Sequence, residues 1–347
     1  MQKPIQIVQV AFTYVGTVVG AGFATGQEIL QFFTRYGAPA VITIAIASAL
    51  FVWLGTKMMI LGQEIGAKSY EDLNRHLFGK QLGGWFSLFT LFILFGITTV
   101  MLAGAGSVFQ EHFHFSYQAG LLITLVLSFI VLSKGLHAIM TVNVIVVPLM
   151  LIFSALIFWI TIDSPHAANW VLRTSDEPAG RIWLSPILYA AFNLATAQAV
   201  LVPLGAAIRD KAVLRMGGLL GGIMIGLMLL AAHFALSSQM PGITQFEIPM
   251  SHLLQKWGFV VQLLFILVIF GEIFTTYLAD VYGLTLQLHN RTGWNRQLIT
   301  CILLLLSYAI SQIGFSTLLS TLYPLFGLVS VIWLAMMIWR RSAPGLR

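Results

Sequence analysis

The chain has 347 residues, of which 58% are hydrophobic and only 9% are charged. A soluble domain carries about 25% charged residues, so the composition excludes a water-facing surface of this size. Apolar runs of about 20 residues, the length that crosses a bilayer as a helix, recur along the sequence. These features predict an all-α polytopic membrane protein whose main surroundings are the lipid bilayer. The net charge of +6 comes from short loops between the runs and does not indicate a nucleic-acid partner.

Ten membrane spans are predicted from the apolar runs and the polar turns between them. They cover residues 7–35, 39–63, 84–109, 117–133, 139–162, 183–208, 216–238, 257–288, 297–311 and 318–339. The single cysteine, Cys301, excludes an intrachain disulfide and a cysteine-based metal cluster. The sequence contains no motif for a nucleophile–base pair, which argues against an enzyme.

The two halves of the chain have a similar spacing of spans. The second, fourth and fifth spans begin at 39, 117 and 139, and the seventh, ninth and tenth at 216, 297 and 318, offsets of 177 to 180 residues. Because five spans are an odd number, the second copy enters the membrane from the opposite face. This pattern predicts a 5+5 inverted repeat, as in many secondary transporters. The predicted units are a first repeat over 1–162, an outer loop over 163–182 and a second repeat over 183–347.

Lysine and arginine in the short loops predict the orientation. With the N-terminus inside, four of the 18 basic residues fall on the outer side, namely Arg35, Arg173, Arg181 and Lys256. The remaining basic residues fall on the inner side. We therefore expect a protein of the inner (cytoplasmic or plasma) membrane with both termini cytoplasmic.

The first span contains four glycines, at 16, 20, 22 and 26, followed by Glu28. Glycine weakens a helix by roughly 1 kcal/mol relative to alanine, so this stretch is a place where a membrane helix can unwind. A break near Val19 would leave the amides of Gly22 and Phe23 at a half-helix N-terminus, which suits a substrate carboxylate. A carboxylate within a span is by default a functional candidate. The alternative is a close-packing face of small residues.

The inverted repeat places the partner of this stretch in the sixth span, near Asn193. Asn193, Thr196 and Gln198 are polar side chains close together in the middle of a span. We therefore predict that spans one and six are both discontinuous and line the substrate cavity, with Phe192 beside it. The alternative is interhelical hydrogen bonding between packed spans.

The eighth span contains Glu272, Thr275, Thr276 and Asp280, which share one helical face by the 3.6-residue period. Carboxylate and hydroxyl oxygens suit small hard cations. This face predicts a cation or proton site, the alternative being a polar packing seam with protonated acids. Glu111 and His112, on an outer loop with His114, match a metal tripod only loosely, and we do not interpret them as a metal site.

Residues 16–22, Gly-Thr-Val-Val-Gly-Ala-Gly, resemble the Gly-Asn-x-x-Gly-x-Gly stretch in the unwound first helix of neurotransmitter:sodium symporters, with Thr17 in place of asparagine. Ten spans arranged as five plus five resemble the leucine-transporter (LeuT) fold of the amino acid–polyamine–organocation (APC) superfamily. The whole chain is similar to the YkvI-type membrane proteins placed in that superfamily.

This resemblance implies a sodium site made of the first-helix carbonyls of Gly16 and Val19. The eighth helix would add the backbone oxygen of Glu272 and the hydroxyls of Thr275 and Thr276. Glu272 departs from the family pattern, in which this position is normally small; its carboxylate would strengthen cation binding or replace sodium coupling by proton coupling. The resemblance also implies alternating access, in which spans 1, 2, 6 and 7 rock against the others.

The sequence therefore predicts a secondary transporter of a small amine-bearing solute, most simply an amino acid, coupled to Na⁺ or H⁺ and without another cofactor. The candidate substrate-binding residues are Ala21, Gly22, Phe23, Glu28, Phe192, Asn193 and Thr196, and the candidates for proton coupling are Glu28, Glu272 and Asp280. Two alternatives stay open at this point: a channel or non-transporting sensor on the same scaffold, and a transporter of a polyamine or quaternary amine. The sequence predicts no oligomeric state.

Overall fold

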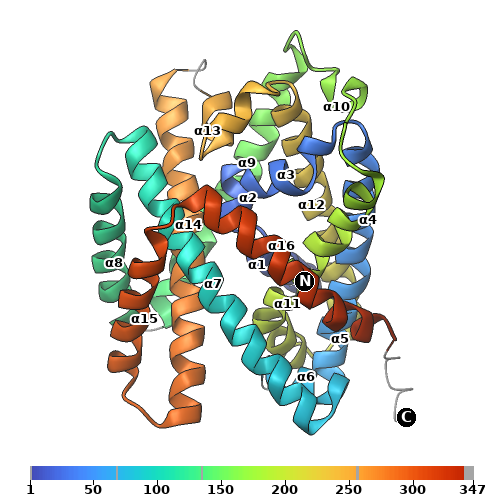
Figure 1. Cartoon of the computed structure of the whole chain (residues 1–347). Helices are drawn as coiled ribbons and strands as arrows, with labels where there is room; N and C mark the ends of the chain where they lie inside the picture. Colours follow the sequence, from blue (N-terminus) through green and yellow to red (C-terminus); the bar gives the residue numbers. More distant parts are fainter. Residues whose placement is uncertain (1, 68, 134–135, 255–257, 340–347) are drawn as a thin grey trace.

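The computed structural model describes residues 2–67, 69–133, 136–254 and 258–339, and these residues contain helices and no strand (Figure 1). Lys256, one of the basic residues assigned above to the outer side, lies outside the described residues. The prediction of an all-α membrane protein is confirmed.

The first half of the chain begins with a helix in three pieces. In order, its elements are α1 (Gln2–Val18), α2 (Ala21–Thr25), α3 (Gln27–Phe32), the 3-10 turn η1 (Thr34–Tyr36), α4 (Pro39–Leu50), the π-helical turn η2 (Phe51–Gly55), α5 (Thr56–Glu64), α6 (Tyr70–Phe78), α7 (Lys80–His112), α8 (Tyr117–Ser133) and α9 (Leu136–Ile162).

The second half of the chain begins with a short helix. Its elements are α10 (Asn169–Leu172), α11 (Ala179–Ala207), α12 (Lys211–Ser237), the 3-10 turn η3 (Gly242–Gln245), α13 (Pro249–Leu253), α14 (Phe259–Thr292), α15 (Arg296–Ser311) and α16 (Phe315–Trp339).

Within the described residues, six helical segments are long and apolar enough to cross a membrane. They are Pro39–Glu64, Lys80–His112, Ala179–Ala207, Lys211–Ser237, Phe259–His289 and Phe315–Trp339, with shorter apolar helices at Tyr117–Ser133, Pro148–Ile162 and Arg296–Ser311. The chain is thus a multi-pass membrane protein. The count of ten spans and the division into repeats over 1–162 and 183–347 stay predictions.

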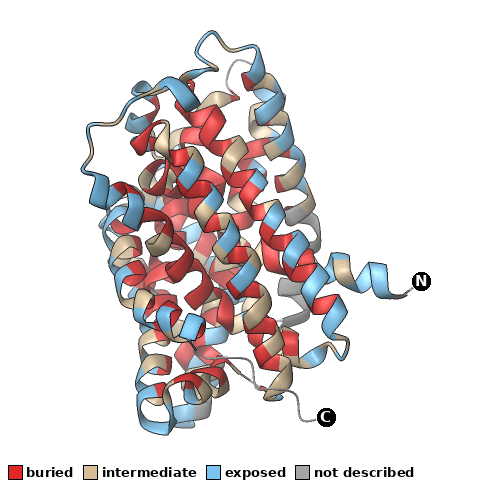
Figure 2. Ribbon diagram, turned by 90° about the vertical axis from the view of Figure 1, so that its right-hand side faces the viewer, coloured by how far each residue is buried: buried red, intermediate tan, exposed pale blue. Residues whose placement is uncertain are grey.

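Most of the helices pack as two groups, and α9 and α16 each contact both of them. In the first, α1 packs on α12 and α11 packs on α5, while α4 contacts both α11 and α12. In the second, α14 lies against α7, and α8 and α15 each contact both of these helices. The buried residues run through the middle of the molecule, and the first turns of α1 project from it (Figure 2). The contact of α1 with α12 corresponds to that of α11 with α5, and the contact of α7 with α15 corresponds to that of α14 with α8. Such paired contacts are compatible with the predicted inverted repeat.

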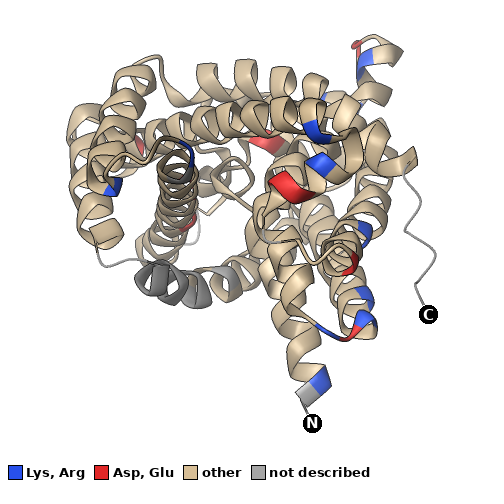
Figure 3. Cartoon of the chain, turned by 90° about the horizontal axis from the view of Figure 1, so that it is seen from below, with Lys and Arg blue, Asp and Glu red and all other residues tan. Residues whose placement is uncertain are grey.

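Different ion pairs lie at the two ends of the molecule. At one end, which we call the Lys3 end, Lys3 pairs with Asp210 at 2.8 Å and Lys211 pairs with Glu64 at 2.9 Å. At the other, the Arg35 end, Arg35 pairs with Glu177 at 2.7 Å. Figure 3 views the chain from below and colours the positions of lysine and arginine blue. Residues predicted on the same side of the membrane thus lie at the same end, whereas the assignment of that end to the cytoplasm stays a prediction.

The prediction of a discontinuous sixth span is wrong for this structure, because α11 runs without a break from Ala179 to Ala207. Asn193 Nδ2 donates to the carbonyl oxygen of Tyr189 at 3.0 Å, and Thr196 Oγ1 donates to that of Asn193 at 2.9 Å. These polar side chains satisfy their hydrogen bonds on their own helix, so they give α11 no reason to unwind.

Two glycines let the backbones of α5 and α11 approach each other. A Cβ atom on Gly205 would lie 2.7 Å from the carbonyl carbon of Met59, and one on Gly62 would lie 2.5 Å from the carbonyl oxygen of Val202. Backbone cannot move aside as a flexible side chain can. Small residues at such a crossing allow the close packing that holds membrane helices together.

We predict that Gly205→Ala lowers the free energy of unfolding by about 1–3 kcal/mol, because overpacking a tight contact costs this much. The measurement is thermal unfolding of the purified protein in detergent. Gly283→Ala on α14 is the matched control, since no heavy atom lies within 4 Å of its Cβ position. Equal melting temperatures for the two variants would contradict the prediction.

Candidate functional site

The centre of the candidate site is the interruption between α1 and α2. The last hydrogen bond of the α1 backbone runs from the Val19 amide to Val15 O at 2.7 Å, and the next one runs from the Ala24 amide to Gly20 O at 2.9 Å. Gly20 has extended backbone, with φ −108° and ψ −166°. In the described backbone, the amides of 20–23 and the carbonyls of 16–19 therefore do not form the helical hydrogen bonds between residues i and i+4. The predicted break near Val19 is present in the structure.

A second change of direction follows at Gly26, which has φ 89° and separates α2 from α3. A residue with a side chain rarely adopts this left-handed conformation, so glycine is required here. The reversal folds Glu28 back over α2. A Cβ atom on Gly22 would lie 2.6 Å from Cγ and 2.8 Å from Cδ of Glu28. The Glu28 carboxyl thus lies directly against Gly22, and only glycine at position 22 leaves space for it.

Glu28 is almost completely buried, at 3% exposure, and its Oε2 has no hydrogen-bond partner among the described residues. Two tyrosines from other helices interact with it electrostatically, Tyr189 on α11 and Tyr323 on α16. The Tyr189 hydroxyl is also buried without a partner at direct hydrogen-bonding distance. Since buried polar groups are normally hydrogen-bonded, both groups have capacity for a further molecule.

Aromatic rings hold Tyr189 in place. Its ring centroid lies 5.3 Å from that of Phe32, 5.0 Å from that of Phe33 and 5.9 Å from that of Phe51. Sequence reasoning did not assign Tyr189 or Tyr323 to the site. The only available signal was a tyrosine hydroxyl within a span, which does not indicate what it faces.

The predicted face of α14 contacts the break. A Cβ atom on Gly20 would lie 3.8 Å from Thr276 Oγ1. Glu272 is 1% exposed and its Oε1 has no partner among the described residues. Asp280 is partly buried, and its buried Oδ2 also has no partner there. Thr275 Oγ1 donates to the carbonyl oxygen of Glu272 at 3.1 Å. The structure thus brings Thr276 beside the break, while the sodium-ligand roles of Gly16, Val19, Glu272 and both threonines stay predictions.

The residues predicted on α11 divide into two kinds. The Phe192 ring packs against Tyr323 in a tilted arrangement with 4.4 Å between centroids, so it reaches the aromatic side of the Glu28 site. Asn193 and Thr196 instead bond along α11, as described above. Gln198 donates to Thr90 Oγ1 of α7 at 3.2 Å, and its own Oε1 is buried without a partner. On α2, Ala21 and Phe23 are both buried.

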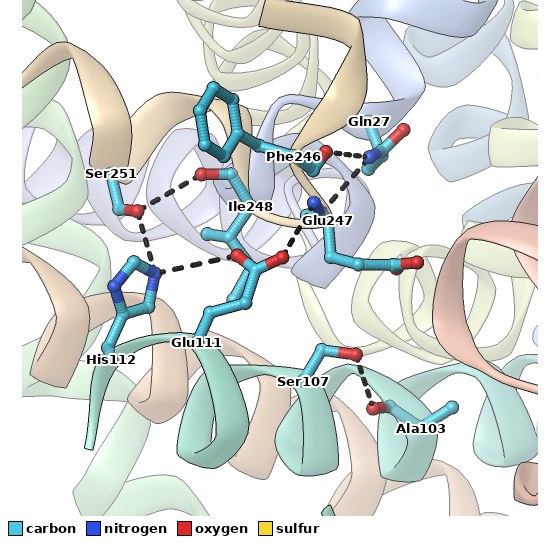
Figure 4. Close-up of polar contacts among 9 residues, drawn as sticks. All are labelled: Gln27, Ala103, Ser107, Glu111, His112, Phe246, Glu247, Ile248 and Ser251. Carbon is cyan, nitrogen blue, oxygen red and sulfur yellow. Dashed lines mark hydrogen bonds and ion pairs between the residues drawn. The ribbon is translucent and has the colours of Figure 1, made fainter. Parts of the chain in front are cut away.

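The loop before α13 is held at the Arg35 end by three hydrogen bonds to different helices, of which Figure 4 draws those of Glu111 and Gln27. The Glu247 amide donates to Glu111 Oε1 at 2.8 Å, the Ser316 amide donates to Glu247 Oε2 at 2.9 Å, and Gln27 Nε2 donates to Phe246 O at 2.7 Å. We call this set the Glu247 clasp. Burial raises the pKa of Glu247, and the Ser316 amide opposes that rise.

Neighbouring contacts extend the clasp over the broken helix. Ser251 Oγ lies 2.7 Å from His112 Nε2, and a Cβ atom on Gly26 would lie 2.9 Å from Met250 Cγ. Through Met250, α13 therefore covers the Arg35 end of the broken helix. Glu111 and His112 have structural partners here, and among the described residues no group of three His, Cys, Asp or Glu could hold a metal ion.

A groove of about 490 Å³ lies elsewhere, between α7, α14 and α15. Its lining is entirely apolar: Trp85, Leu88, Phe89, Leu91, Phe92, Phe95, Leu284, Leu303 and Leu306. Several of these side chains are widely exposed, as expected for a surface that contacts lipid. The groove contributes no polar group to the Glu28 site.

Comparison with known proteins places the chain in a family. It is 41% identical over 338 residues to the uncharacterized membrane protein YkvI of Bacillus subtilis (strain 168), and the match covers 96% of each chain. The chain belongs to the YkvI family. A second relative of this YkvI family member is the uncharacterized protein YyaD of the same organism, 26% identical over 317 residues and 91% of each chain. No family model matches the chain.

Solved transporter structures share the fold of this YkvI family member. The inward-facing conformation of Mhp1 matches with a TM-score of 0.71 at 13% identity, over 96% of this chain and 75% of that one. MhsT in complex with L-phenylalanine matches with a TM-score of 0.70 at 13% identity, over 97% and 89%. A manganese transporter of Eremococcus coleocola matches with a TM-score of 0.62 at 13% identity, over 96% and 76%. The chain therefore has the LeuT fold; its membership of the APC superfamily stays a prediction.

We predict that Glu111→Ala loosens the Glu247 clasp, because it removes the acceptor of the Glu247 amide. A hydrogen bond to a charged group contributes about 1.5–3 kcal/mol, so amide exchange across 246–251 should become roughly 10- to 100-fold faster. Hydrogen–deuterium exchange with mass spectrometry measures this.

Glu177→Ala is the control for the clasp, since Glu177 accepts from Arg35 and Arg181 at the same end of the molecule. This control should leave exchange across 246–251 unchanged. Unchanged exchange in Glu111→Ala would show that the clasp does not hold the loop.

Proposed function

We propose that this protein is a secondary transporter that moves a small amine-bearing solute by alternating access, coupled to Na⁺ or H⁺. The observation that carries the proposal is a set of buried carboxyls, each with an oxygen that has no partner among the described residues: Glu28, Glu272 and Asp280. They lie on α3 and α14, around a helix that is interrupted within the membrane.

The charge balance of these carboxyls favours cationic ligands. None of the three forms an ion pair with a described lysine, arginine or histidine, since the ion pairs lie at the two ends of the molecule. An unpaired charge within a membrane is expensive, and such residues usually belong to substrate, ion or proton pathways. A protonatable or cation-binding role for Glu272 and Asp280, with amine recognition by Glu28, gives each carboxyl a partner.

The fold supports the transport mechanism. Two of the solved structures compared above are transporters by their descriptions, namely Mhp1, a nucleobase-cation-symport-1 family transporter, and a manganese transporter. A third, MhsT, holds L-phenylalanine. The group of α1, α4, α5, α11 and α12 would rock against the group of α7, α8, α14 and α15. Sites at the boundary of two such groups lie near the bilayer midplane in transporters of this kind.

For the coupling ion, we propose that Thr276 and Thr275 contribute hydroxyls to a sodium site, with carbonyls of Gly16 and Val19 and the backbone oxygen of Glu272. The position of Thr276 beside Gly20 and the carbonyls that the break leaves outside the ladder support this assignment. Hard oxygen ligands of this kind suit Na⁺.

We predict that the double variant Thr275→Ala/Thr276→Ala loses the thermal stabilisation that NaCl gives the wild type relative to KCl. Binding of an ion to the folded state stabilises it by mass action, so losing the site removes that difference. Thr124→Ala, a buried threonine of α8 that bonds to its own helix, is the control. A sodium response that survives in the double variant would refute the sodium site.

We also predict that Glu28→Gln abolishes solute accumulation in proteoliposomes while the variant folds and purifies as the wild type does. Glutamine keeps the shape of the side chain and removes the charge that pairs with an amine. The probes are radiolabelled amines and amino acids that stabilise the wild type in a thermal-shift screen. Glu177→Gln at the surface should transport normally. Wild-type transport by Glu28→Gln would make this carboxyl a packing group.

A further inference from the structure

From the position of Glu28 against Gly22, we infer that the solute is a small organic cation without a carboxylate, such as a primary or quaternary amine. This inference rests on the proposed function and specifies its substrate class. It replaces the expectation that the break binds a substrate carboxylate.

The first step is steric. The amides of Gly22 and Phe23 are the groups that a substrate carboxylate would use, but the Glu28 side chain lies directly on Gly22, with Cγ and Cδ at 2.6 and 2.8 Å from the Cβ position. Gly26 holds α3 in the orientation that puts it there. The protein's own carboxyl thus lies against the residue whose amide an amino acid's carboxylate would use.

The second step is electrostatic. Two carboxylates about 4 Å apart repel each other strongly in a medium less polar than water. No described basic side chain forms an ion pair with Glu28, and the groups that interact with it are the hydroxyls of Tyr189 and Tyr323. A zwitterion brings no net positive charge to this place, whereas a simple amine supplies one.

The third step is the composition of the surrounding wall. Tyr189 is fully buried and its hydroxyl faces Glu28, so a ligand held by the carboxyl also meets this hydroxyl. Phe192 and Tyr323 pack against each other in the same region, with their rings tilted and 4.4 Å between centroids. Aromatic faces attract ammonium groups, most strongly where water is excluded. A carboxyl among aromatic rings is therefore suited to a cationic amine.

The test compares matched pairs that differ in the carboxylate, by thermal shift of the purified full-length protein. The pairs are isoamylamine with leucine, phenethylamine with phenylalanine, cadaverine with lysine, and choline with glycine betaine. We expect at least one amine to raise Tm by about 3–6 °C at saturation, while its carboxylate-bearing partner leaves Tm unchanged.

Two variants connect this response to the site. Glu28→Gln should weaken binding of the responding amine by at least about 30-fold, because it removes one member of a buried charge pair. Tyr189→Phe keeps the packing of the ring and should weaken binding by less. Glu177→Gln, at the surface, should bind the amine as the wild type does.

The outcomes separate this inference from the transporter proposal. A carboxylate-bearing member that stabilises the protein as well as its amine, or no response to any amine, overturns the inference. If an amino acid both binds and accumulates in proteoliposomes, transport stands and the inference fails. If an amine binds through Glu28 but does not cross the membrane, recognition stands and the transporter proposal fails.

Discussion

The constraint on which this structure depends is the need to enclose an unwound backbone within a membrane. Each backbone group without a hydrogen bond costs several kcal/mol in hydrocarbon, so an interrupted helix is tolerated only where protein or a polar cavity surrounds it. The interruption at Val19–Gly20 is surrounded in this way. Thr276 of α14 lies beside Gly20, and Met250 of α13 lies on Gly26. Helices from both halves of the chain therefore meet at these residues.

Enclosure also explains why the carboxyl of Glu28 is not exposed to lipid. The left-handed Gly26 turns α3 back, so a residue six positions after Gly22 lies on Gly22 itself. The two helix ends, the carboxyl and the tyrosine hydroxyls share one buried region, in which each polar group is near others rather than near hydrocarbon. A polar interior of this kind is costly for folding, and its persistence within a span is a sign of ligand binding.

The sequence could predict features that depend on local chemistry. The predicted fourth span, 117–133, has the bounds of α8, and the glycines of the first span identified the break because glycine weakens any helix. The face of α14 also followed from helical period alone. Features that depend on partners were not predictable. Asn193 in an apolar span suggested a break, yet its amide bonds to Tyr189 O and α11 continues. Nothing local shows that Glu28 covers Gly22 or that Tyr189 faces Glu28.

The Glu247 clasp and the Glu28 site are connected through adjacent residues of α3. Gln27 donates to the clasp, and Glu28, the next residue, lies on Gly22. Consecutive helical residues point about 100° apart, so one short rigid helix faces the loop with one side chain and the break with the other. A movement of α3 large enough to bring Glu28 off Gly22 also pulls Gln27 from Phe246 O. Because Glu111 and Ser316 hold the loop to α7 and α16, the loop does not follow that movement freely. The clasp and the break are therefore joined through the two adjacent side chains of α3.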